Sequence, residues 1–178
     1  MRAAKPPVQR TGFAAAAERI IALWALFGGA VLVLAIAANL AEVAAALAYP
    51  LTGRSFSGAV ELTEIAAAVA VFAFLPWCQL SGANATADIF TSRAGPRTLA
   101  VLGLVASIVA LGFALLLVWR MWLGMADLRE FRHSTAILGL PLWPAFIPIL
   151  ISLGLLALAS AVTLAEDWRA ARNPEPQA

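Results

Sequence analysis

Any chemistry in this sequence has to come from a few ionisable side chains that border long apolar runs. Glu42, Glu61 and Glu64 each lie beside such a run, and the chain has one histidine, His133, and one cysteine, Cys78. An ionisable group in hydrocarbon is costly and is usually retained for a task, such as carrying a proton or an ion. Single copies of histidine and cysteine exclude an internal disulfide, a multi-cysteine zinc site and a haem held between two histidines of this chain.

The three glutamates lie at the edge of the predicted spans rather than near their middle. Glu61 and Glu64 are neighbours on one helix face, in the first turns of a predicted helix that Ser57 would cap. Negative charge there suits the positive end of the helix dipole. Two interpretations stay open: carboxylates in partial contact with water, or carboxylates buried against an arginine or another subunit. An ion carrier normally places its acid near the bilayer midplane, which disfavours that role.

The motifs that hydrolysis or nucleotide binding requires are absent from the sequence. It contains no H-E-x-x-H, G-x-S-x-G, P-loop or G-x-G-x-x-G. His133 follows Arg132 in a predicted loop with Asp127 and Glu130, a pattern typical of a solvated charge cluster. Asn39 lies deeper in a span, where a neutral amide favours a helix–helix hydrogen bond over ion ligation. We therefore predict a protein that is not an enzyme and that holds no cofactor or metal of its own.

The composition indicates that the natural solvent of this chain is a lipid bilayer. Hydrophobic residues make up 62% of its 178 residues and charged residues only 12%. An average soluble domain has about 25% charged residues, because these cover its surface. The formal net charge of +2 is too small for the dense basic face that nucleic-acid binding requires, so no nucleic-acid partner is expected.

Four runs are long enough to cross the hydrocarbon core, which takes about 20 apolar residues in a helix. We predict an all-α integral membrane protein with one four-helix membrane domain at 20–165, between tails at 1–19 and 166–178. The first run is free of charge over residues 20–41. The apolar stretch of a cleaved signal peptide is only about 7 to 15 residues, so this run is predicted to be an uncleaved anchor. The predicted spans are about 20–42, 59–80, 98–123 and 143–165, and Pro76 and Ser81 mark the exit of the second.

Basic residues and tryptophans predict how the spans are oriented. Eight of the twelve Lys and Arg residues fall in the two tails and the loop between the second and third spans, so both termini are predicted to be cytoplasmic. Tryptophan prefers the boundary between water and hydrocarbon on either side of a membrane. The predicted interfacial belt consists of Trp24, Trp77 and Trp168 on the cytoplasmic side and Trp119, Trp122 and Trp143 on the outer side.

Small residues are the candidates for close helix packing, because the hydrophobic effect does not drive one helix against another in lipid. The spacing of small residues predicts contacts in the first, third and fourth spans. The candidate pairs are Ala25 with Gly29, Gly103 with Ser107 and Ala110 with Ala114, and the fourth span contributes Ser152, Gly154, Ser160 and Thr163.

Two stretches of the sequence resemble the small membrane subunit (DctQ type) of tripartite ATP-independent periplasmic (TRAP) transporters. The first is GAVELTEIAAAVAVFAFLPWCQLSGANATADIF at 58–90, in which Glu61 or Glu64 would be the family's glutamate, Gly82 its glycine and Asp88 its aspartate. The family usually has a histidine at the position where this chain has Asn84. The second is STAILGLPLWPAFIPILISLGLLAL at 134–158, which is similar to the family's Leu-Gly-hydrophobic-Pro sequence and the apolar run that follows.

The resemblance implies a division of labour within a transporter of the bacterial inner membrane. A periplasmic solute-binding protein delivers an organic acid, a large membrane subunit carries it with a sodium gradient, and the small subunit does not form the sodium or substrate site. This chain is then expected to act as a scaffold for the large subunit. Its outer loops, around 52–57 and 120–141, would be available to the binding protein. Arg129, Glu130 and Arg132 would steer that docking electrostatically.

Two rival functions are kept as alternatives. A self-contained small multidrug exporter acts as a dimer with a membrane-embedded glutamate that exchanges protons, and Glu42 is the acid of the first span that could serve it. Its place at the end of that span rather than the middle weakens this alternative. A structural subunit of a redox complex would have His133 as its one ligand residue, with no companions.

Overall fold

The described part of the chain is built from long helices that are apolar enough to cross a membrane. The computed structural model describes residues 12–52, 58–81 and 96–172. Four of its helices have the length and hydropathy of membrane spans, and no strand occurs in these three segments. This confirms the prediction of an all-α protein with four spanning helices. The elements are α1 (Phe13–Thr52), α2 (Ala59–Ser81), α4 (Pro96–Glu130), a 3-10 turn η1 (Trp143–Ala145) and α5 (Phe146–Arg172).

Two of the helices are longer than the membrane is thick. The 40 residues of α1 and the 35 residues of α4 reach about 60 Å and 52 Å at a rise of about 1.5 Å per residue, whereas the hydrocarbon core is about 30 Å. Helix α1 therefore continues well past Glu42, and α4 continues to Glu130. Asp127 and Glu130 lie in the last turn of α4, so the prediction that they belong to a loop is wrong. The edge of a bilayer need not end a helix, and most residues of the stretch 120–130 are Arg, Met, Leu or Ala, which favour helix.

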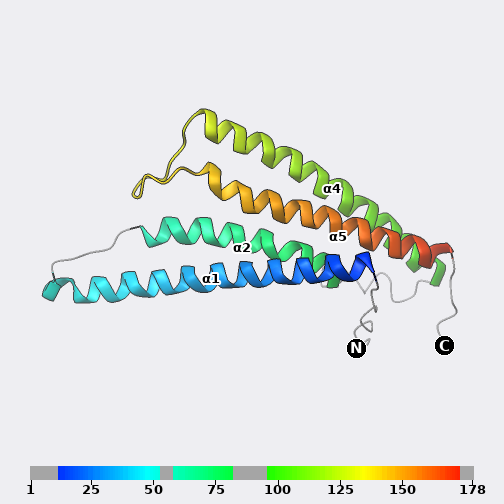
Figure 1. The fold of residues 1–178 in the computed structure, drawn as a ribbon, viewed down its shortest axis with the longest axis horizontal. Coiled ribbons are helices and arrows are strands. Elements are labelled where there is room, and N and C mark those ends of the chain that lie inside the picture. Colours follow the sequence, from blue (N-terminus) through cyan, green and yellow to red (C-terminus); the bar gives the residue numbers. More distant parts are fainter. Residues whose placement is uncertain (1–11, 53–57, 82–95, 173–178) are drawn as a thin grey trace.

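The helices form an open array rather than a closed bundle (Figure 1). Helix α1 packs along α2, α2 along α5 and α5 along α4, with a smaller contact between α1 and α5. Helix α5 lies inside this array and α4 at its margin, since 33% of the apolar window of α5 is buried but only 11% of that of α4. The array therefore leaves much apolar helix surface uncovered.

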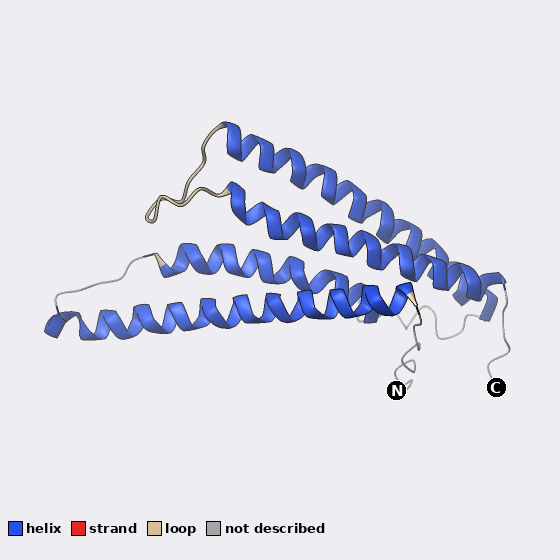
Figure 2. Ribbon diagram, in the orientation of Figure 1, coloured by secondary structure: helices blue, strands red, loops and turns tan. Residues whose placement is uncertain are grey.

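The two ends of the array differ in how closely the helices approach one another. The start of α1 and the end of α5 lie at one end, which we call the terminal end, and the α4–α5 connection lies at the other, which we call the loop end (Figure 1). The α1–α2 pair and the α4–α5 pair converge at the terminal end and diverge towards the loop end. Figure 2 shows the α4–α5 loop, residues 131–142, extending from this open end towards the start of α2.

Helices α1 and α2 approach most closely at Gly28. A Cβ atom at Gly28 would lie 2.6 Å from the Cβ of Ala73 and 3.4 Å from the backbone oxygen of Ala70, so only glycine fits there. A Cβ at Gly29, by contrast, would have no atom within 4 Å. The predicted contact through Gly29 is therefore wrong by one residue, because in a run rich in small residues the sequence does not fix which face meets the partner.

Helix α2 ends at Ser81 and contains Pro76, the proline that was predicted to mark the exit of the second span. Pro76 is fully buried inside α2, and the helix continues to Ser81. A proline removes one backbone donor and disturbs the preceding turn, but membrane helices tolerate it where neighbouring helices pack around it. Ser81 is the last residue of the helix, as predicted.

Candidate functional site at the loop end

The carboxylate of Glu61 holds the tip of the α4–α5 loop. Its Oε1 accepts a hydrogen bond from the backbone N–H of Ile137 at 2.7 Å, and its Oε2 accepts one from the N–H of Leu138 at 3.0 Å. Hydrogen bonds to an ionised acceptor are roughly twice as strong as neutral ones. Glu61 is half-buried, so its carboxylate stays in partial contact with water, and the loop backbone is a further partner that the sequence did not reveal.

The loop is folded so that these two N–H groups are free to meet Glu61. The N–H of Thr135 donates to the carbonyl oxygen of Leu140 at 2.9 Å, and the N–H of Leu140 donates to Oγ1 of Thr135 at 3.1 Å. Ser134 and Pro141 form an isolated antiparallel bridge at the base of the loop. Gly139 has a φ of +63°, a left-handed conformation that glycine adopts without a steric penalty.

An apolar contact between Gly58 and Leu138 accompanies the hydrogen bonds of Glu61. Gly58 precedes α2 with a φ of +124°, and a Cβ atom there would lie 2.7 Å from Cγ of Leu138. The Leu138 side chain thus packs over the bare backbone of Gly58. We call this group, Gly58, Glu61, Ile137 and Leu138, the loop latch. It brings together the two stretches that carry the family resemblance.

The other two glutamates do not take part in the loop latch. Glu64 lies one turn further along α2 and is exposed, and Glu42 is half-buried on α1. Neither side chain pairs with another residue of the described segments. Val60, Glu64 and Val71 are all exposed on α2, and their spacing of four and seven residues places them on one face of the helix. The structure therefore assigns the two neighbouring glutamates to different surroundings.

The charged residues near the end of α4 are accessible at the loop end. Arg129, Glu130 and Arg132 are exposed. The guanidinium of Arg129 lies 5.6 Å from the centroid of the Trp143 ring, a cation–π contact that joins the end of α4 to η1. Arg132 has a φ of 51° in the turn that follows the helix. The docking role of these three residues stays a prediction.

Tryptophans lie at both ends of the array, and one of them makes an interior contact. Trp77 and Trp168 are exposed towards the terminal end, and Trp119 and Trp122 are exposed on the half of α4 nearer the loop end. Trp24 is half-buried, and its indole N–H donates to Oγ of the fully buried Ser152 on α5 at 2.8 Å. The interfacial belt stays a prediction for the set, and Trp24 has a helix–helix contact that the sequence did not reveal.

Further polar contacts tie neighbouring helices together away from the loop latch. Asn39 on α1 donates to Oγ1 of Thr63 on α2 and to the backbone of its own helix, as expected of a neutral amide in a span. Ser107 on α4 donates to the carboxylate of Asp167 on α5, a pair that the sequence analysis missed.

Some of the candidate residues lie in parts of the chain that the structure does not describe. Asn84 and Asp88 lie outside the described residues, as does the proposed cap Ser57. Within the segments that the structure describes, no three His, Cys, Asp or Glu side chains come together as metal ligands would.

One comparison with known proteins gives a match. A family model described as "Tripartite ATP-independent periplasmic transporters, DctQ component" matches residues 47–170. The match covers the whole of α2 and α4 and all but the last two residues of α5, and it includes every residue of the loop latch. No curated protein and no solved structure matches the chain.

Proposed function

Because the chain belongs to the DctQ family and is therefore the small permease component of a TRAP transporter, we propose that it is the fixed scaffold of that transporter. In this proposal it lies in the bacterial inner membrane with both termini in the cytoplasm. It packs against a large membrane subunit, which imports an organic acid with a sodium gradient. A periplasmic solute-binding protein delivers the acid to the assembled pair.

The observation that supports this role best is the openness of the helix array. In the apolar windows of α1 and α4 only 17% and 11% of the residues are buried, so most of their surface is available to lipid or to another protein. Lipid tails are as apolar as leucine, so helices associate in a membrane through close packing and polar contacts rather than through the hydrophobic effect. An open array offers a broad surface for such packing, as a scaffold requires.

Several polar side chains of the described segments hold the array together. Glu61 binds a loop, Asn39 and Trp24 bind neighbouring helices, and Asp167 binds Ser107. These groups are occupied in structural contacts, which supports the placement of the sodium and substrate sites in the large subunit.

We assign the exposed face of α2 that carries Val60, Glu64 and Val71 to the contact with the large subunit. Glu64 lies near the start of α2 and is exposed. Its carboxylate is therefore available to a basic or hydrogen-bonding group of another protein. An elevator-like carrier needs a fixed part against which to move, and this contact would enlarge that part.

The proposal is tested by capture and cross-linking in native membranes. A tagged chain solubilised in mild detergent is expected to bring down a large membrane protein in roughly equal amount, and sodium-driven uptake in liposomes should be lost without this chain. In a Cys78→Ser background, Val71→Cys should cross-link to the large subunit. Leu34→Cys on α1, which is 69% exposed against 59% for Val71, is the matched control.

The exporter alternative gives the opposite result in the same experiment. Recovery of this chain alone as a dimer, with transport by the purified dimer that depends on Glu42, would overturn the scaffold role. The family assignment does not favour that alternative. Cross-linking from Leu34→Cys but not from Val71→Cys would keep the scaffold role and overturn the choice of face.

A further inference from the structure

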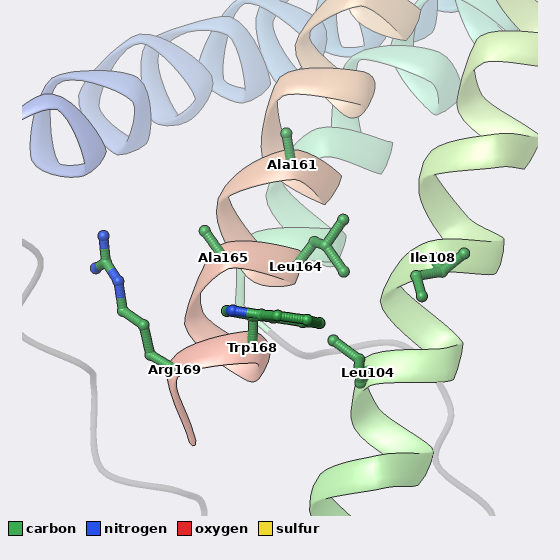
Figure 3. A pocket seen from close by; sticks show the side chains of 7 residues that line it. All are labelled: Leu104, Ile108, Ala161, Leu164, Ala165, Trp168 and Arg169. Atoms are coloured by element: carbon green, nitrogen blue, oxygen red, sulfur yellow. The ribbon is translucent and has the colours of Figure 1, made fainter. Parts of the chain in front are cut away.

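An open apolar groove lies between α4 and α5 near the terminal end (Figure 3). Its volume is about 550 Å³. Leu104 and Ile108 line it from α4, and Ala161, Leu164 and Ala165 line it from α5. Trp168 lies across the end of the groove, as Figure 3 shows. The groove exists because the alanines of α5 leave space opposite the larger side chains of α4.

Two arginines stand at the end of this apolar groove. Arg169 borders it, and both Arg169 and Arg172 lie in the last turn of α5. Ala161, Ala165, Trp168 and Arg172 are spaced by four, three and four residues, so they share one face of the helix. The nearby carboxylate of Asp167 is turned towards α4, where it accepts a hydrogen bond from Ser107. Arg169 is the one charged residue among those that line the groove, so the lining itself carries positive charge.

We propose that the groove binds an anionic phospholipid, with an acyl chain along Ala161 and Ala165 and the headgroup phosphate at Arg169 and Arg172. The two alanines are exposed on a membrane-spanning helix, so the groove opens to the side where lipid lies. Tryptophan prefers the level of the lipid headgroups, which is where Trp168 would then stand. Basic residues at that level attract anionic lipids.

The residues around the groove favour an anionic lipid over a helix of another protein. Trp168 and Arg169 both border it, and tryptophan and basic residues are the types that meet lipid headgroups at the membrane surface. An extended hydrocarbon chain is also thin enough to follow the length of the groove. This inference is independent of the transport function, because it rests only on the groove and its charges.

Native mass spectrometry of the delipidated full-length chain tests the proposal. We would titrate the protein with phosphatidylglycerol and with phosphatidylcholine of the same acyl chains. The structure predicts tighter binding of phosphatidylglycerol, and Arg169→Gln and Arg172→Gln should each lower its affinity about fivefold, towards that of phosphatidylcholine. Arg120→Gln removes the same charge from an exposed position of α4 outside the groove and should leave both affinities unchanged.

A second pair of variants tests the apolar part of the site. Ala165→Phe fills the groove and should abolish binding of both lipids at this site, whereas Ala30→Phe at an exposed position of α1 should not. Circular dichroism establishes that each variant keeps its helices. Equal affinity for the two lipids, or unchanged binding in Ala165→Phe, would overturn the proposal. So would loss of a co-purified membrane protein in Ala165→Phe while lipid binding persists, because a protein would then be the occupant.

Discussion

The two ends of the helix array are held together by different kinds of contact. At the terminal end the helices touch directly: Ile21 of α1, Leu80 of α2 and Ala159 of α5 form one buried cluster. At the loop end the two helix pairs diverge, and a loop bridges them through the carboxylate of Glu61 (Figure 1). Side-chain packing thus dominates at the terminal end, whereas at the loop end hydrogen bonds from loop backbone to one carboxylate join the helix pairs, beside the contact of Leu138 with Gly58.

This difference shows where the array can be opened with the least rearrangement. Packed side chains have many small contacts, and removing one leaves the others in place. The loop latch has one carboxylate and one leucine side chain, so a single substitution can release it. We infer that the terminal end fixes the array and that the loop end sets the position of the surface offered to a partner.

Gly58→Ala should lower the stability of the protein more than any other variant proposed here, because it disturbs the loop latch in two ways. A Cβ atom would be forced into a φ of +124° and into contact with Leu138. Backbone strain and overpacking each cost about 1 to 3 kcal/mol, so we expect a loss of about 3 kcal/mol in the free energy of unfolding, measured by denaturant titration in detergent.

A double variant separates the two causes. Adding Leu138→Ala to Gly58→Ala removes the steric clash but keeps the backbone strain, so it should restore part of the stability. If Gly58→Ala alone is as stable as the native chain, the close contact between Leu138 and the start of α2 is wrong.

Glu61→Ala should release the loop without disturbing the helices. The N–H groups of Ile137 and Leu138 lose their acceptor, so their hydrogen exchange should accelerate by about tenfold. Exchange mass spectrometry of a peptide spanning 134–142 measures this. Glu64→Ala, which removes the same charge one turn away, is the matched control and should leave these amides protected. Equal acceleration in both variants would mean that negative charge, rather than the latch, protects the loop.

Ser107→Ala tests the terminal end and should have a smaller effect than either latch variant. It removes the hydrogen bond to Asp167, but the apolar cluster around Ile21 and Leu80 stays intact. Hydrogen bonds between membrane helices contribute about 1 kcal/mol, which is the expected loss in unfolding free energy. Ser81→Ala, whose hydroxyl bonds only within α2, is the control. A loss as large as that of Gly58→Ala would contradict the contrast between the two ends.

The sequence predicted the spans and the helix–helix hydrogen bond of Asn39, but not most of the other contacts between helices. Hydropathy over some 20 residues is enough to locate a span, whereas the limits of α1 and α4 depend on helix propensity beyond the membrane edge. The sequence offered no reason to expect different roles for Glu61 and Glu64. The loop that binds Glu61 and not Glu64 is more than 70 residues away along the chain. The sequence predicted Gly29 rather than Gly28 as the contact residue for a similar reason. Which of the two glycines meets α2 depends on where Ala73 of that helix lies.

The charges beside the loop latch should have the smallest effect, and it should be on the rate of docking rather than on stability. Arg132→Gln removes an exposed charge in the turn after α4, and we expect the association rate with the solute-binding protein to change by about threefold at low salt. The effect should vanish at high salt, where exposed charges are screened. Arg132 is preferable to Arg129, because Arg129 also packs over Trp143. Arg19→Gln on α1, exposed towards the terminal end, is the control. If the partner docks at the loop end, only charges at that end should alter the association rate. An equal change of this rate in Arg19→Gln would show that the net charge of the protein, rather than the loop end, steers the partner.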